Sequence, residues 1–201
     1  LDIVASGSQK GYMIPPGLSF ISMSEKAWEA SERSDLPKFY LNLKSYKKSL
    51  KNNSNPYTPA VNLVFALDES LKMMREEGLK NIFARHDRHK LAISNAMKAL
   101  NLKLFAAEDH LSPSITAIET INFDAEEFRK IIKNKFDILL AGGQDHLKGK
   151  IFRVGHLGYV NDRDIITVIS AISSALLDQN KITTTQAGEA INVASKYLDI
   201  N

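Results

Sequence analysis

The sequence contains no cysteine and a single tryptophan among its 201 residues. Without cysteine the chain forms neither disulfide bonds nor thiolate metal sites, which fits a reducing compartment. No apolar run approaches the roughly 20 residues that a membrane-spanning helix needs, and the first residues do not have the pattern of a signal peptide. We therefore expect a cytoplasmic protein that does not associate with a membrane.

Neither sign of charge is in large excess. The chain has 26 Lys and Arg against 23 Asp and Glu, a formal net charge of +3. The densest basic cluster is Lys44, Lys47, Lys48 and Lys51, and a solvated helix face explains it without a nucleic acid. With 44% hydrophobic and 24% charged residues, the composition is typical of a globular chain with one or two cores.

A lysine lies on a short loop of small residues near the start of the sequence. Lys10 belongs to Ser6-Gly7-Ser8-Gln9-Lys10-Gly11, between apolar runs at 1–5 and 18–22 that have the composition of strands. Such a loop can hold a lysine that attacks a carbonyl, provided that a partly desolvated pocket or a nearby positive charge removes its proton. On spacing alone, an ordinary exposed lysine is the more common interpretation.

Apolar periodicity predicts the remaining elements. Helices are expected at 24–33, 36–50, 61–77, 79–100, 125–134, 161–177 and 184–198. Further strands are expected at 102–105, 115–121, 136–141 and 151–154, and a loop rich in helix breakers at 52–59. After residue 79 this order describes an α+β or α/β unit with a small, largely antiparallel sheet.

These elements suggest four parts. Residues 1–55 form the first part, 56–79 a connecting segment and helix, 80–178 a compact domain, and 179–201 a helical tail. Two strands and two helices cannot cover both faces of a sheet. The packing partners of the first part must therefore lie elsewhere, upstream in a longer chain or in a second chain.

Arg153 and Thr58 are two further candidate site residues. Arg153 lies in an apolar strand, where an arginine is costly unless it meets an anion, and its planar fork suits a carboxylate. A strand-edge arginine that points to solvent is an equally good interpretation. Thr58 precedes a predicted helix, where a hydroxyl and free amides can bind phosphate, although a plain cap or turn is more common.

The histidines are weaker candidates for site residues. His86 and His89 are three residues apart on one predicted helix face and could ligate a metal. No third ligand is apparent, so we expect a solvated helix face and no metal site. The other histidines, His110, His146 and His156, show no triad spacing.

Three segments together resemble a known family. Ser6 to Lys10, followed by Pro15-Pro16-Gly17, is similar to the cofactor-lysine segment of class V (fold-type I) aminotransferases, the group of alanine–glyoxylate and serine–pyruvate aminotransferases. Tyr57-Thr58-Pro59-Ala60-Val61 resembles the segment that enters the family's interdomain helix. Arg153-Val154-Gly155-His156-Leu157-Gly158 resembles its Arg-[Ile/Val]-Gly-x-[Leu/Met]-Gly segment. The resemblance covers residues 1 to about 178.

The resemblance implies an α/β fold: the C-terminal part of a fold-type I transferase dependent on pyridoxal phosphate, with the end of the large α/β domain and the smaller α+β domain. It places Lys10 on the Schiff-base lysine that holds pyridoxal 5'-phosphate, and Gln9 on a neighbour that helps to hold it. Thr58 falls on a residue that contacts the cofactor phosphate of the neighbouring subunit, which implies a homodimer. Arg153 falls on the arginine that binds the substrate α-carboxylate.

The implied activity is transamination between a small amino acid, such as alanine or serine, and a 2-oxo acid, such as glyoxylate or pyruvate. The freed Lys10 amine would move the proton between the substrate Cα and the cofactor. In the family, the acidic partner of the cofactor nitrogen and much of the phosphate cup precede the lysine, and that half is not in this sequence. We therefore expect the chain alone to be incomplete, as the C-terminal portion of an aminotransferase or one chain of a split enzyme.

Three alternatives remain at this point. A cysteine desulfurase shares the fold, but the chain lacks its reactive cysteine. A phosphoserine-type aminotransferase would need basic groups for a substrate phosphate, and the sequence assigns none. The chain could also be a non-catalytic fragment or an interaction subunit that keeps the family fold.

Overall fold

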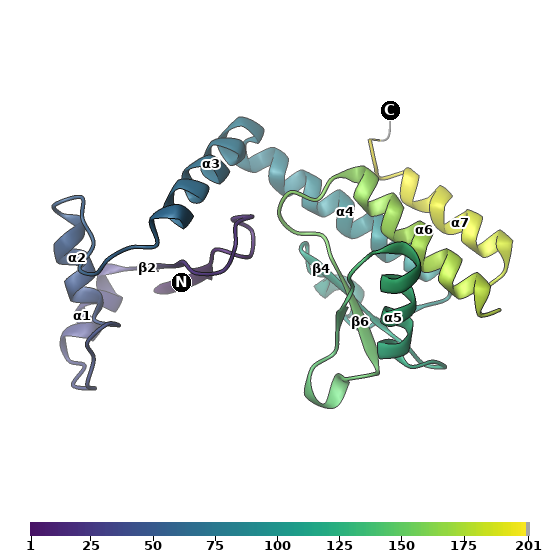
Figure 1. Cartoon of the computed structure of the whole chain (residues 1–201), viewed down its shortest axis with the longest axis horizontal. Helices are drawn as coiled ribbons and strands as arrows, with labels where there is room; N and C mark the ends of the chain where they lie inside the picture. The colour runs from purple at the N-terminus through teal and green to yellow at the C-terminus, as the bar shows by residue number, and fades with distance from the viewer. Residues whose placement is uncertain (200–201) are drawn as a thin grey trace. The chain divides into compact units, whose positions relative to one another are not determined.

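The structure is a computed structural model that describes residues 1–199. The chain divides into two compact units, Leu1–Glu76 and a second unit that begins at Glu77. The colours of Figure 1 follow the first unit from purple to blue and the second from teal to yellow. The lysine loop belongs to the first unit and the Arg153 strand to the second.

The first unit begins with a two-stranded antiparallel sheet. β1 (Ile3–Gly7) pairs with β2 (Ser19–Met23), and Gly7 lies opposite Ser19. The helices that follow are α1 (Glu25–Glu32), α2 (Leu43–Leu50) and α3 (Val61–Glu77). Ser24 caps α1 by accepting a hydrogen bond from the Ala27 amide at 3.2 Å. These bounds confirm the predicted helices at 24–33 and 61–77.

The predicted helix over 36–50 is wrong in its first seven residues, because α2 starts only at Leu43. Pro37 disfavours helical geometry at the residue before it. The side chain of Asn42 accepts a hydrogen bond from the Lys44 amide at 3.1 Å and so starts the helix there.

The first unit buries little of its own apolar surface. Ile14 and Ala27 are the only buried hydrophobic residues among residues 1–76. Large apolar side chains that remain exposed in this unit include Leu1, Ile3, Val4, Ile21, Leu36, Phe39, Tyr40, Leu41, Leu50, Val61, Val64 and Phe65. An apolar surface of this extent is typical of a face that another polypeptide covers.

The second unit has its own sheet and helices. Its four antiparallel strands lie in the order β3 (Lys103–Leu104), β4 (Ile115–Glu119), β6 (Ile151–Gly155) and β5 (Ala141–Gly142). Its helices are α4 (Leu79–Ala99), α5 (Ala125–Phe136), α6 (Asp162–Asp178) and α7 (Thr184–Ser195), with short 3-10 helices at Glu108–His110 and Asp145–Leu147. α7 packs against α4 and α6, and α5 packs against α6 and the β5–β6 side of the sheet (Figure 1).

The core of the second unit lies between its sheet and its helices. Phe152 and Val154 point from β6 into this core, and the rings of Phe128 and Phe152 are 5.2 Å apart. α4 contributes the buried residues Ile82, Ile93 and Met97, a stripe at helical spacing that the sequence predicts. Because side chains alternate along a strand, Arg153 faces the other side of the sheet.

The expected strand at 136–141 is largely wrong. α5 continues to Phe136, Asp137 ends it in a left-handed conformation with φ of +55°, and β5 covers only two residues. A side chain at Gly142 would place its Cβ 2.5 Å from Glu126 Oε1, so this short strand passes close to α5. The observed mixed α/β architecture is otherwise the predicted one.

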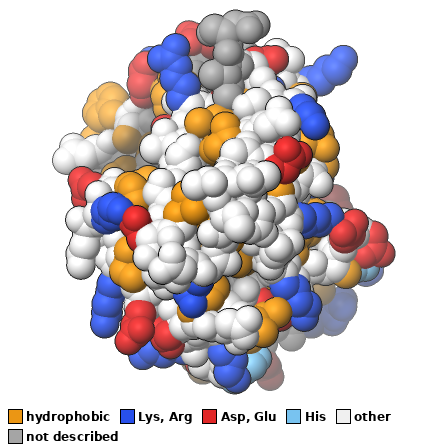
Figure 2. Space-filling view, turned by 90° about the vertical axis from the view of Figure 1, so that its right-hand side faces the viewer, with side chains coloured by type: hydrophobic (Ala, Val, Ile, Leu, Met, Phe, Trp, Pro, Cys, Tyr) orange, Lys and Arg blue, Asp and Glu red, His pale blue; other side chains and the backbone are white. Residues whose placement is uncertain are grey.

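The surface gives two further findings. Among residues 1–199, no helix combines the length and apolar character needed to cross a bilayer. On the face shown in Figure 2, Lys and Arg side chains are interspersed with Asp and Glu, and the apolar side chains form small groups. That face therefore lacks, within the described part of the chain, the extended basic surface typical of a nucleic-acid site.

Candidate functional site

Ser8 closes the loop that carries Lys10. Its side chain is completely buried, and its Oγ donates to the Pro15 carbonyl at 2.7 Å and accepts from the Leu18 amide at 3.1 Å. The Ser8 amide also donates to the Leu18 carbonyl at 3.0 Å. The two ends of the loop are therefore joined through one residue, which the sequence analysis did not single out.

Lys10 lies in the turn directly after β1, and its side chain is exposed. Its amide donates to the Gly7 carbonyl at 3.3 Å, and its carbonyl accepts from the Met13 amide at 3.0 Å. The backbone is thus held while the amine stays accessible. The residues of the first unit do not form the desolvated pocket that the sequence analysis expects around a reactive lysine.

Gln9 folds back along the same loop. A Cβ at Gly7 would lie 2.7 Å from Gln9 Oε1, so only glycine leaves space for this side chain position. The amide group of Gln9 and the amine of Lys10 thus project from one short, anchored segment.

Thr58 is exposed, three residues before α3. Its hydroxyl forms no hydrogen bond to any of residues 1–199, and it does not cap the helix. The neighbouring Tyr57 is fixed, because its hydroxyl donates to the Phe39 carbonyl at 3.1 Å and its ring lies 4.9 Å from that of Tyr40. A free hydroxyl therefore follows a well-anchored aromatic residue.

Arg153 lies in the middle of the second unit's sheet, on the face opposite the core. It stands opposite Ala117 of β4 and Ala141 of β5, two small residues that leave space around it. β6 is an inner strand, so the interpretation of Arg153 as a strand-edge residue is wrong. Its Nε donates to the Gly142 carbonyl at 2.9 Å, and no carboxylate of residues 1–199 pairs with it. The two terminal nitrogens can therefore bind an anion side by side.

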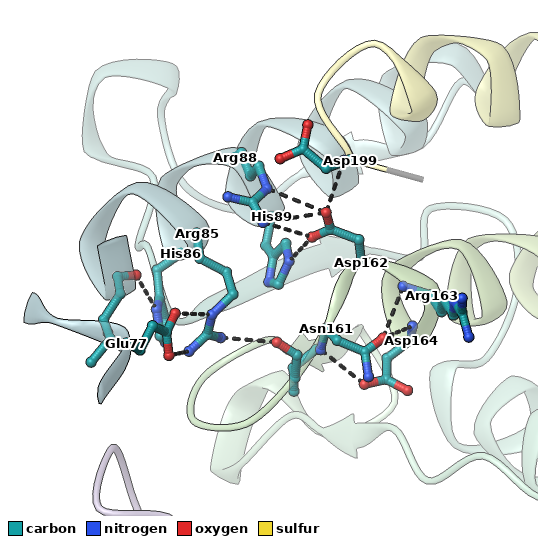
Figure 3. A network of polar contacts seen from close by, with 12 residues as sticks. Glu77, Arg85, His86, Arg88, His89, Asn161, Asp162, Arg163, Asp164 and Asp199 are labelled. Atoms are coloured by element: carbon teal, nitrogen blue, oxygen red, sulfur yellow. Dashed lines mark hydrogen bonds and ion pairs between the residues drawn. The ribbon is translucent and has the colours of Figure 1, made fainter. Parts of the chain in front are cut away.

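The expectation that the histidines of α4 lie on a solvated helix face is wrong. His89 is fully buried, and its Nε2 lies 2.6 Å from Asp162 Oδ1 (Figure 3). Burial lowers the pKa of His89, and the bond to Asp162 opposes this change. Burial alone would raise the pKa of Asp162, but bonds from His89, the Asp199 amide and Arg88 hold it below its usual value.

His86 and Arg85 bind the backbone that follows β6. His86 Nε2 accepts a hydrogen bond from the Gly158 amide at 3.2 Å. Arg85 Nη1 donates to the carbonyls of Gly158 and Val160 at 2.8 and 2.9 Å, and Figure 3 shows Arg85 beside the backbone that precedes Asn161. Within residues 1–199 no cluster of three or more His, Cys, Asp or Glu residues is arranged to hold a metal ion.

His156 is, with His89, the second fully buried histidine, and it lies within the segment that resembles the carboxylate-binding motif. Its Nε2 lies 3.0 Å from the Thr116 hydroxyl. Burial, followed by repulsion from His89 and His86 when these are charged, lowers its pKa from 6.5 to about 4. His156 is therefore uncharged at neutral pH.

Comparisons with known proteins show what the chain is similar to. No family model matches the chain. A relative described as a soluble hydrogenase 42 kDa subunit, from Anabaena cylindrica, is 58% identical over 178 residues, 89% of this chain and 46% of the relative. The serine–glyoxylate aminotransferase of Methylorubrum extorquens is 34% identical over 211 residues, 100% of this chain and 51% of the relative.

A solved structure of an aminotransferase has a similar fold. The ureidoglycine–glyoxylate aminotransferase of Bacillus subtilis superposes with a TM-score of 0.87 at 27% identity, over 98% of this chain and 52% of that one. The homologues of this chain include class V aminotransferases, and the chain corresponds to the C-terminal half of their length. It spans about half the length of the curated relatives that it matches.

Proposed function

We propose that this chain supplies the C-terminal part of an aminotransferase dependent on pyridoxal phosphate, acting on a small amino acid (alanine or serine) and a 2-oxo acid (glyoxylate or pyruvate). The observation that carries the proposal is the lysine loop: Ser8 locks the backbone on both sides of Lys10 while the amine remains accessible. The similarity of the chain to aminotransferases supports this role for the loop.

The available donor groups fit the cofactor. Lys10 offers a primary amine for an aldehyde, while the Gln9 amide and the unbonded Thr58 hydroxyl are suited to a phosphate. When bound, pyridoxal phosphate supplies an electron sink for the substrate Cα. Lys10 Nζ would take the proton from Cα and return it, and the two terminal nitrogens of Arg153 would fix the substrate carboxylate.

A partner polypeptide is also part of this proposal. The first unit leaves twelve large apolar side chains exposed, and its only buried hydrophobic residues are Ile14 and Ala27. Because the relatives are about twice as long as the matched region, we propose that a polypeptide equivalent to their other half covers this surface. It would be part of the same protein or a second chain, and a second copy of the assembly would bring Thr58 to the neighbouring cofactor phosphate.

A different function is favoured by one observation. The Anabaena relative is described as a hydrogenase subunit, so this chain could be an accessory subunit that keeps the fold without catalysis. With no cysteine among its 201 residues, it could not itself supply thiolate ligands to a metal centre. In such a subunit Lys10 would have no chemical role.

Trapping of the cofactor on Lys10 separates the two functions. The chain would be purified together with a polypeptide equivalent to the other half of its relatives, reduced with borohydride after addition of pyridoxal phosphate, and mapped by peptide mass. We expect a pyridoxyl group on Lys10, none on this peptide in Lys10→Ala, and unchanged labelling in the control Lys51→Ala, which alters another exposed lysine of the first unit.

Two results would contradict the proposal. If Lys10 stays unmodified in the assembled protein, the accessory-subunit function is favoured. If the purified 201-residue chain catalyses transamination with no partner, the expected incompleteness of the chain is wrong.

A further inference from the structure

The segment between β6 and α6, residues 156–161, is held largely by side chains of α4. We propose that His86 and Arg85 are positioning residues, which hold this segment in the conformation that lets Arg153 bind the substrate carboxylate. This inference rests on the proposed function, because it assumes that Arg153 binds a carboxylate. Figure 3 shows the α4 side chains that reach this part of the backbone.

The hydrogen-bond partners of His86 show which of its ring nitrogens carries the hydrogen. Nδ1 lies 2.7 Å from the Ile82 carbonyl, which can only accept, so Nδ1 carries the hydrogen. Nε2 lies 3.2 Å from the Gly158 amide, which can only donate, so Nε2 carries none. His86 thus binds Gly158 only as the neutral Nδ1–H tautomer. A charged imidazole would have a hydrogen at both positions and could not accept this bond.

Arg85 holds the carbonyl side of the same segment. Its guanidinium forms a two-point pair with Glu77, at 2.6 Å from Nε and 2.9 Å from Nη2, which fixes the plane of the group. Nη1 then points to the carbonyls of Gly158 and Val160. The side chain of Arg85 is only 12% exposed, so these bonds are shielded from water.

Leu157 connects this segment to the face of the sheet that carries Arg153. Gly155 is two residues after Arg153 and therefore lies on the same face of β6. The Leu157 side chain approaches Gly155, with Cδ2 3.7 Å from the position of a Cβ there, and the Gly155 site is otherwise open. Because Gly158 follows Leu157 directly, release of Gly158 would also loosen the contact of Leu157 with Gly155, on the face of the sheet that carries Arg153.

Two measurements on the 201-residue chain test the inference. The first is hydrogen exchange of the Gly158 amide by NMR. The second is titration with pyruvate, followed at the Arg153 Nε–H signal, which the bond to Gly142 holds in place. In His86→Leu we expect Gly158 to exchange at least about tenfold faster and pyruvate affinity to fall about tenfold, since a buried donor loses its partner.

Two variants separate positioning from a general loss of structure. His86→Gln keeps an acceptor near the Nε2 position, and we expect both measurements to stay within about threefold of wild type. His110→Leu makes the same change at an exposed histidine and should alter neither value. In the assembled enzyme, His86→Leu should raise KM for the amino acid more than it lowers kcat.

The outcomes discriminate clearly. Wild-type exchange or wild-type pyruvate affinity in His86→Leu overturns the inference, as does equal impairment in His86→Leu and His86→Gln, or failure of the wild-type chain to bind pyruvate at Arg153. If pyruvate binds as described but Lys10 never acquires the cofactor, the proposed function fails while the positioning role of His86 is supported.

Discussion

His156 should make the stability of the second unit depend on pH. Burial lowers its pKa from the ordinary 6.5 to about 4, so between these values the unfolded chain binds a proton that the folded chain does not. The free energy of unfolding contributed by His156 is therefore fully present above about pH 6.5 and falls as the pH falls toward 4. The full effect is about 3 kcal/mol, of which about 2 kcal/mol is lost between pH 7.5 and 5.

The assay is urea unfolding of wild type and His156→Gln at about pH 7.5 and about pH 5. Glutamine removes the titrating group but can still bond to the Thr116 hydroxyl, which lies 3.0 Å from His156 Nε2. Burial lowers the pKa of His89 as well, so both proteins lose stability in acid. We expect the wild type to lose about 2 kcal/mol more than His156→Gln. Equal losses in the two proteins would refute the reasoning, and the exposed control His110→Gln should follow the wild type.

Three other substitutions have defined outcomes. Ser8→Ala removes the side-chain partner of the Pro15 carbonyl and the Leu18 amide; it should cost about 1 kcal/mol of local stability and speed hydrogen exchange at the Leu18 amide, and unchanged exchange would contradict the role of Ser8. Gly143→Ala places a Cβ against the Leu147 carbonyl; thermal unfolding should show a loss of about 1–3 kcal/mol, and an unchanged Tm would show that the backbone adapts freely. Arg153→Lys should weaken pyruvate binding about tenfold, because an ammonium group cannot form two parallel bonds, and wild-type affinity would argue against that geometry.

The elements that the sequence predicts most accurately are those with local end signals. Three helices, α1, α5 and α6, each begin after a residue whose side chain accepts a hydrogen bond from a backbone amide. These residues are Ser24, Asp124 and Asn161. Such caps act within three or four residues, so they are visible in the sequence itself. The predicted starts of these helices agree with the structure within one residue.

The failed prediction at 136–141 depends on tertiary contacts, whereas the helix over 36–50 was predicted too long although Pro37 and Asn42 mark its start locally. The apolar run at 136–141 has no end signal that separates helix from strand. In the structure Phe136 packs against the core as the last residue of α5, and Arg129 donates from α5 to the Leu140 carbonyl at 2.7 Å. Tertiary packing therefore determines the secondary structure of this segment, because its local sequence pattern is ambiguous.

The residues of the candidate site likewise divide into those that the sequence identifies and those that it does not. Lys10, Gln9, Thr58 and Arg153 stand out in the sequence because each belongs to a short segment similar to a family motif. Ser8 does not stand out, because its role depends on a loop closing between β1 and β2. Its signal was weak but present: a small hydroxyl residue at the start of a loop that must return to a neighbouring strand can bond across the loop.

The sequence also contained information about the surroundings of the α4 histidines. Ile82, Ile93 and Met97 face inward at helical spacing, and positions 86 and 89 fall on the same stripe, four and seven residues after Ile82. A histidine on an inward stripe needs a hydrogen-bond partner, because an unpaired buried polar group is costly. The inward stripe thus implied partners for His86 and His89 and argued against a solvated face. The identity of those partners was not available, since Gly158 and Asp162 are 72 and 73 residues away along the chain.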